Sequence, residues 1–64
     1  MIDIVQHFFI IFSVGDTFTI YDIIEKMNIS RPTAILLLKR LYKKGRIKNM
    51  TPPGDMIKCY IVDY

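Results

Sequence analysis

The chain has 64 residues, of which 52% are hydrophobic and 23% are charged, and its formal net charge is +3. This composition excludes a disordered segment, and the length allows one domain, residues 1–64, that buries only about 60% of the surface its unfolded chain exposes. A single cysteine and a single histidine exclude an internal disulfide and a closed four-ligand metal site. A partner chain is therefore the expected source of additional stability.

The charges are distributed unevenly along the chain. Residues 1–25 carry four acids and no Lys or Arg, and residues 26–54 carry eight basic residues and no acid. Residues 55–64 add two acids and one Lys, so the three segments sum to −4, +8 and −1. Such a one-sided basic block in a small domain predicts a polyanionic partner.

Residues 2–14 form the first expected helix, which ends before Gly15. It is apolar nearly all round, which is typical of a helix buried on more than one side, and one layer of neighbours in a chain this short cannot cover it. The sequence therefore predicts a homodimer that uses this helix. Alternatively, the helix only closes the monomer core. The expected interface residues are Ile2, Val5, Phe9 and Phe12.

A short strand and a second helix follow. Residues 17–19 alternate polar and apolar, which predicts a strand with Phe18 pointing inward. Thr19 and Asp22 have the spacing of a capping box for a helix over residues 20–27. Apolar residues in that helix recur at i, i+3, i+4 and i+7, and they define one buried face: Ile20, Ile23, Ile24 and Met27.

Residues 31–44 are the third expected helix and hold much of the basic block. Ser30 is the expected N-cap, Pro32 stands in the first turn, and Gly45 is the expected left-handed residue after the helix end. At 100° per residue the core side is formed by Ala34, Leu38 and Leu41, with Leu37 and Tyr42 beside them. On the opposite, outward side lie Pro32, Thr33, Leu36, Lys39, Arg40, Lys43 and Lys44, with Ile35 at the margin.

Two strand-like runs, residues 46–51 and 56–62, complete the pattern as a β-hairpin. Pro53-Gly54 between them suits the central positions of a type II turn. Tyr60 and Val62 are expected to face the core.

This order of elements resembles the winged helix-turn-helix domain, an α+β fold. Residues 19–50, "TIYDIIEKMNISRPTAILLLKRLYKKGRIKNM", are similar to the core of small MarR- and ArsR-like archaeal, bacterial or viral transcriptional regulators. The resemblance covers about residues 17–62. It is carried by the joint spacing of Ser30, Thr33, Ala34, Leu38, Leu41, Gly45 and Ile47.

The resemblance implies a dimeric repressor that places residues 31–44 in the major groove of double-stranded DNA, with the hairpin as a wing on the backbone or minor groove. Positions 35–37 are commonly polar in the family but aliphatic here, so we expect phosphate contacts to dominate and sequence preference to be weak. Leu36 can contact thymine methyl groups. The expected DNA-binding residues are Ser30, Arg31, Thr33, Leu36, Lys39, Arg40, Lys43, Lys44, Arg46, Lys48 and Lys58.

Two other functions compete with DNA binding. A winged-helix protein-interaction module would use Ile35 and Leu36 without DNA. Attachment to an anionic membrane surface through residues 2–14 is opposed by the absence of basic residues there. We expect no enzyme, because His7 has no nucleophile or third partner beside it, and no metal, cofactor or small-molecule ligand.

The N-terminus predicts a cytoplasmic protein, in the host cell if the chain is viral. It carries Asp3 where a secretory signal has basic residues, and its longest apolar run, residues 8–12, is far shorter than the roughly 20 residues of a membrane span. The Ile-, Lys- and Tyr-rich, Trp-free composition would suit a hyperthermophilic archaeon or its virus.

Overall fold

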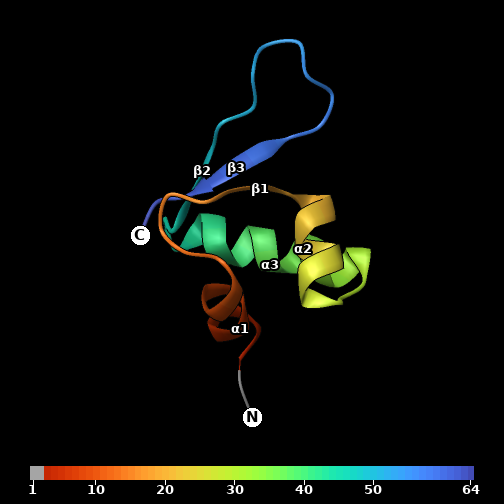
Figure 1. Ribbon diagram of the computed structural model, residues 1–64, viewed down its shortest axis with the longest axis vertical. Helices are drawn as coiled ribbons and strands as arrows, with labels where there is room; N and C mark the ends of the chain where they lie inside the picture. The colour runs from red at the N-terminus through yellow and green to blue at the C-terminus, as the bar shows by residue number, and fades with distance from the viewer. Residues whose placement is uncertain (1–2) are drawn as a thin grey trace.

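The computed structural model describes residues 3–64, which form an α+β fold of three helices and a three-stranded antiparallel sheet (Figure 1). The helices are α1 (Ile4–Ile11), α2 (Ile20–Met27) and α3 (Arg31–Lys43), and all three lie on one side of the sheet. The strands are β1 (Thr17–Thr19), β2 (Ile47–Asn49) and β3 (Cys59–Val62). Residues 50–58 form a loop between β2 and β3 that projects away from the helices along the longest axis (Figure 1).

The last strand, β3, is the central strand of the sheet. The strand order is β1-β3-β2, and both neighbours run antiparallel to β3. Phe18 of β1 stands opposite Tyr60, and Ile47 of β2 stands opposite Val62. All four side chains are buried, as alternate positions of a half-buried sheet require.

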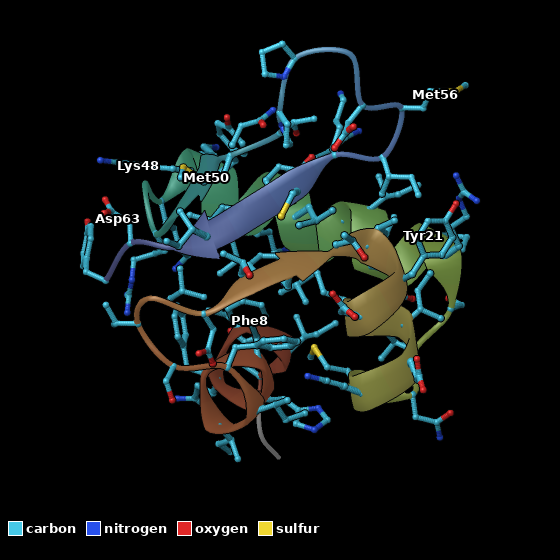
Figure 2. The ribbon with its side chains drawn as sticks, turned by 45° about the horizontal axis from the view of Figure 1, so that its top comes forward. Phe8, Tyr21, Lys48, Met50, Met56 and Asp63 are labelled. Atoms are coloured by element: carbon cyan, nitrogen blue, oxygen red, sulfur yellow. The ribbon has the colours of Figure 1, made fainter. Side chains whose placement is uncertain are left out.

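Aromatic side chains fill the space between the sheet and the helices. The Phe8 ring is fully buried and stacks on Phe12 at a centroid distance of 4.8 Å, and its edge meets Phe18 at 5.3 Å. Figure 2 shows Phe8 reaching from α1 toward the sheet. Aliphatic residues of α2 and α3 complete the core: Ile23, Met27, Ala34, Leu37 and Leu41.

The predicted start of α2 is confirmed, and its bounds are those expected from the sequence. The Thr19 N–H donates to Asp22 Oδ2 at 2.9 Å, and the Asp22 N–H donates to Thr19 Oγ1 at 3.4 Å, so the capping box is closed. The helix ends at Asn28, which adopts the left-handed conformation with φ 54°. The capping box thereby satisfies two backbone N–H donors, those of Thr19 and Asp22, at the N-terminal end of this short helix.

The predicted left-handed glycine after α3 is also confirmed, although the helix ends at Lys43, one residue before the expected end at 44. Gly45 has φ 70°, and its N–H donates to the Tyr42 carbonyl at 3.0 Å. The Arg46 N–H donates to the Leu41 carbonyl at 3.0 Å, which completes a Schellman motif. The chain therefore turns sharply from α3 into β2.

The first helix is shorter than the expected range 2–14. Asp3 is extended and serves as the N-cap, so the helix begins at Ile4, and Phe12 is already extended at the other end. A turn over Ser13–Asp16 replaces the last helical residues, because Asp16 Oδ2 accepts the Ser13 N–H at 2.8 Å and Gly15 adopts φ 92°. None of the helices formed by residues 3–64 has the length and apolarity needed to cross a membrane.

The hairpin strands are shorter than the expected ranges 46–51 and 56–62. Asn49 Oδ1 accepts the Thr51 N–H at 2.8 Å, and Thr51 Oγ1 accepts the Cys59 N–H at 3.0 Å. Beyond Asn49 one backbone bond of the pairing remains, in which the Met50 N–H donates to the Cys59 carbonyl at 2.7 Å, and the side-chain bonds take over after it. The tip itself follows the prediction, since Gly54 has φ 87° and the Asp55 N–H donates to the Pro52 carbonyl at 3.2 Å.

Candidate nucleic-acid interface

Exposed cationic side chains follow the outward side of α3. The helix turns Ala34, Leu37 and Leu41 into the core, where all three are fully buried. The basic residues occupy other positions around the helix axis, so the same periodicity that buries the core residues exposes the basic ones to solvent. We call the exposed cations the basic face: Lys39, Arg40, Lys43 and the C-cap residue Lys44 on the outward side, and Arg31 on the side that faces the hairpin.

Two of the predicted DNA-binding residues bond to each other at the start of α3. Ser30 occupies the N-cap but its side chain makes no capping bond, and its Oγ lies 2.9 Å from Thr33 Oγ1. Pro32 stands in the first turn, as predicted. The sequence therefore places Ser30 correctly, but the hydroxyl is paired with Thr33 and does not cap the backbone.

Two cations near α3 and β2 have carboxylate partners at the surface. Arg40 Nη1 lies 3.9 Å from Asp3 Oδ1, and Lys48 Nζ lies 3.7 Å from Asp63 Oδ1. Figure 2 shows Lys48 and Asp63 at the same end of the sheet. Exposed pairs of this length contribute little to stability, so both cations remain available to a stronger anion.

Arg46 has a structural position that the sequence did not predict. Its guanidinium carbon lies 4.4 Å from the centre of the Phe9 ring and 5.0 Å from the centre of the Tyr64 ring. Its Nε donates to the Tyr64 backbone oxygen at 2.6 Å. Arg46 is thus half-buried between α1 and the segment after β3, where it links distant parts of the chain; its predicted contact with DNA would require it to leave both rings.

Replacing Arg46 with alanine is expected to lower the free energy of unfolding by about 1–2 kcal/mol, because two cation–π contacts and a hydrogen bond are lost. Arg46→Lys should recover only part of this loss, since an ammonium cannot stack as a planar guanidinium does. Urea unfolding followed by circular dichroism measures both. Lys44→Ala, an exposed neighbour, is the control; equal losses for Arg46→Ala and Lys44→Ala would contradict the structural role.

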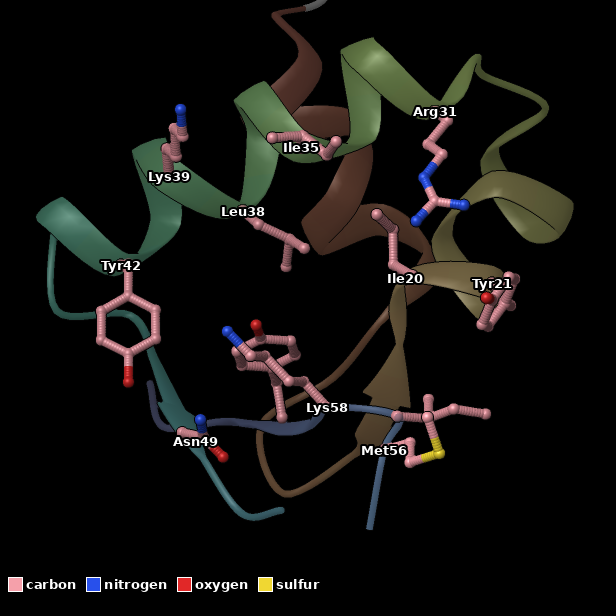
Figure 3. A pocket seen from close by; sticks show the side chains of 12 residues that line it. Ile20, Tyr21, Arg31, Ile35, Leu38, Lys39, Tyr42, Asn49, Met56 and Lys58 are labelled. Atoms are coloured by element: carbon pink, nitrogen blue, oxygen red, sulfur yellow. The ribbon is translucent and has the colours of Figure 1, made fainter.

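A groove of about 610 Å³ separates α3 from the hairpin (Figure 3). Its lining is mainly apolar and aromatic, and three cations, Arg31, Lys39 and Lys58, are the charged side chains among the lining residues. In Figure 3, Arg31 extends toward Ile20 at one end of the groove and Tyr42 stands at the other. The remaining lining residues are Tyr21, Ile35, Leu38, Asn49, Met56, Ile57 and Tyr60.

The floor of the groove is formed partly by Tyr60, whose ring lies 6.2 Å from that of Tyr42 in an edge-on arrangement. Burial, and secondarily the proximity of Tyr42, raises the pKa of the Tyr60 hydroxyl above its ordinary value. This group is therefore an uncharged hydrogen-bonding group at neutral pH. The groove was not predicted from the sequence, because the position of Met56, Ile57 and Lys58 opposite α3 follows from the sheet order and not from any local pattern.

The residues predicted to form a dimer interface are distributed differently. Val5 and Phe12 belong to the core of the single chain, Phe9 is half-buried beneath Arg46, and Ile2 lies outside the described residues. The exposed apolar residue of α1 is instead Ile10, of which 68% is accessible. An α1 interface thus stays a prediction, and it would have to be built around Ile10.

Comparisons with protein-family models, with curated proteins and with solved structures found no match to this chain.

Proposed function

We propose that the protein is a winged-helix protein that binds double-stranded DNA through α3. The observation that supports this most directly is the basic face, which has four exposed cations on the 13-residue helix α3 and a fifth, Lys44, at its C-cap. Lys48 and Lys58 extend the same charge onto the hairpin. Phosphate neutralisation by such cations supplies most of the affinity in sequence-independent binding.

The dimensions of α3 suit the major groove. A helix with side chains is about 10–12 Å across, and the major groove of B-DNA is about 12 Å wide. With α3 in that groove, the projecting β2–β3 loop is the segment that can reach the neighbouring backbone or minor groove. Its tip is Pro52-Pro53-Gly54, which carries no cation, so Lys48 and Lys58 at its base would make the charged contacts. If the loop is only a turn, removing these two charges will leave the affinity unchanged.

A second copy of the chain would double the number of phosphate contacts. We propose that the protein acts as a dimer and represses transcription by occupying a promoter, with two α3 helices in successive major grooves roughly 34 Å apart. Exposed Ile10 on α1 and Val14 just after it, of which 68% and 65% are accessible, are the apolar residues that could meet in such a dimer. Burying them would also supply stability that a 64-residue chain lacks.

Fluorescence anisotropy of a labelled random-sequence duplex tests the proposal. A dimer that touches six or more phosphates should lose about a thousandfold or more in affinity as salt rises from about 50 to 200 mM. A steep linear slope of log affinity against log salt supports DNA binding. No binding at the lowest salt concentration would overturn it.

The apolar groove favours a second candidate, a module that binds another protein without DNA. Ile35, Leu36, Tyr42 and Met56 are all exposed in or beside the groove, and exposed apolar clusters often mark protein contacts. The salt titration separates the two candidates, because burial of apolar surface depends only weakly on salt whereas phosphate contacts depend on it steeply.

A further inference from the structure

The position of Leu36 on α3 is unusual for an aliphatic residue. At 100° per residue it lies about 200° around the helix axis from Ala34, which is fully buried. Leu36 therefore points almost directly away from the core, and 51% of it is accessible. Lys39 and Arg40, one turn later, lie on either side of this direction. If α3 lies in a groove of DNA, the residue in this direction comes nearest to the bases.

The outward side of α3 is divided along its length. Its first half presents Pro32, Ile35 and Leu36, and its second half presents the four cations at positions 39, 40, 43 and 44. Pro32 and Leu36 are four residues apart, so they lie one above the other on the same stripe. In helix-turn-helix proteins the N-terminal residues of such a helix contact base edges. The part of α3 with that role is therefore apolar.

Polar residues of the first half of α3 are held elsewhere. Thr33 is half-buried and its hydroxyl lies 2.9 Å from that of Ser30. Arg31 extends along the groove toward Ile20, on the side of the helix that faces the hairpin (Figure 3). Neither side chain lies on the Pro32–Leu36 stripe, so hydrogen bonds to bases are not what this stripe offers.

The base edges in the major groove present one apolar substituent, the C5 methyl group of thymine. We propose that Leu36, supported by Pro32, recognises thymine methyl groups, so that the protein prefers thymine-rich sites in duplex DNA. This inference rests on the proposed DNA binding through α3, and it assigns the sequence preference to apolar contact. The cations of the second half then hold the helix on the phosphates without reading sequence.

The direct test replaces thymine with uracil in a duplex with a thymine-rich centre. Uracil keeps every hydrogen-bonding group of thymine and lacks only the methyl. The wild-type protein should bind the uracil duplex more weakly, by roughly fourfold for each methyl group that is no longer buried. Leu36→Ala should bind both duplexes with nearly the same affinity, because the group that contacts the methyl is missing.

Met50→Ala is the matched control, since Met50 is also an exposed apolar residue, of which 54% is accessible against 51% of Leu36, but it lies just after β2 and outside α3. It should keep the full preference for thymine. Equal affinity of the wild-type protein for the two duplexes, with a steep salt dependence retained, would overturn the thymine preference and leave the proposed function intact. A preference of unchanged size in Leu36→Ala would overturn the role of Leu36. Absence of binding to either duplex would overturn the proposed function as well.

Discussion

Replacing Lys39 and Lys43 together with glutamine is expected to weaken DNA binding by roughly fifty- to a hundredfold for each bound chain at about 0.1 M salt. Each lysine lies on the outward side of α3, is exposed, and is proposed to neutralise one phosphate. The slope of log affinity against log salt should fall by about 2 per chain, because each contact contributes about 0.9. Anisotropy titrations of wild type and variant at several salt concentrations measure both quantities.

Lys26→Glu provides the control for net charge. Both the double glutamine variant and Lys26→Glu lower the net charge from +3 to +1, one by removing two positive charges and the other by reversing one. Lys26 lies in the last turn of α2, with its Nζ 5.4 Å from the centre of the Phe12 ring, away from the outward side of α3. If the two variants lose the same affinity, total charge and not the α3 surface governs binding.

Replacing Phe8 with alanine is expected to unfold most of the protein. Truncating a fully buried Phe costs about 3–5 kcal/mol through lost burial and the cavity left behind. A chain of this length has roughly 3–10 kcal/mol of total stability. Phe8 contacts Phe9, Phe12 and Phe18 by ring stacking or edge contacts, so its loss removes the centre of the aromatic cluster. Thermal unfolding by circular dichroism should show a large fall in the melting temperature or no folded baseline.

Ile10→Ala on the same helix separates core packing from a general effect on α1. Ile10 is largely exposed, so within one chain the change should alter stability by about 0.5 kcal/mol or less. A larger loss that depends on protein concentration would indicate that Ile10 is buried between two chains. Equal losses for Phe8→Ala and Ile10→Ala at all concentrations would contradict the core assigned to Phe8.

Local patterns in the sequence predicted the parts of the fold that depend on short-range chemistry. The bounds of α2 follow from the Thr19–Asp22 capping box and from apolar spacing, and the end of α3 follows from Gly45. The predicted end of α1 was wrong. Apolar residues continue to Val14, but the carboxylate of Asp16 accepts the Ser13 N–H and stabilises the turn that follows the helix. A pattern of apolar residues indicates which side chains are buried and not whether the backbone is helical. Phe12 is buried although its backbone is extended.

The candidate site was predicted only where it lies on one helix. The exposed cations of α3 and the exposure of Leu36 follow from helical angles alone. The position of Arg46 between Phe9 and Tyr64 joins residues that are far apart in the sequence, so no local pattern could reveal it. The groove likewise depends on how the hairpin is placed against α3, which is set by tertiary pairing.

The order β1-β3-β2 also constrains how the protein is made. Neither β1 nor β2 has another strand to pair with until β3 is synthesised, about 40 residues after β1. At roughly 5–20 residues per second this delay lasts about 2–8 s. During that time Phe18 lacks the strand that covers it, and Ile47, which is made 12 residues before Cys59, lacks it only in the last part of the delay. Only the helices can form early. The nascent chain thus acquires its sheet, and the support that holds α3 in place, in one late step.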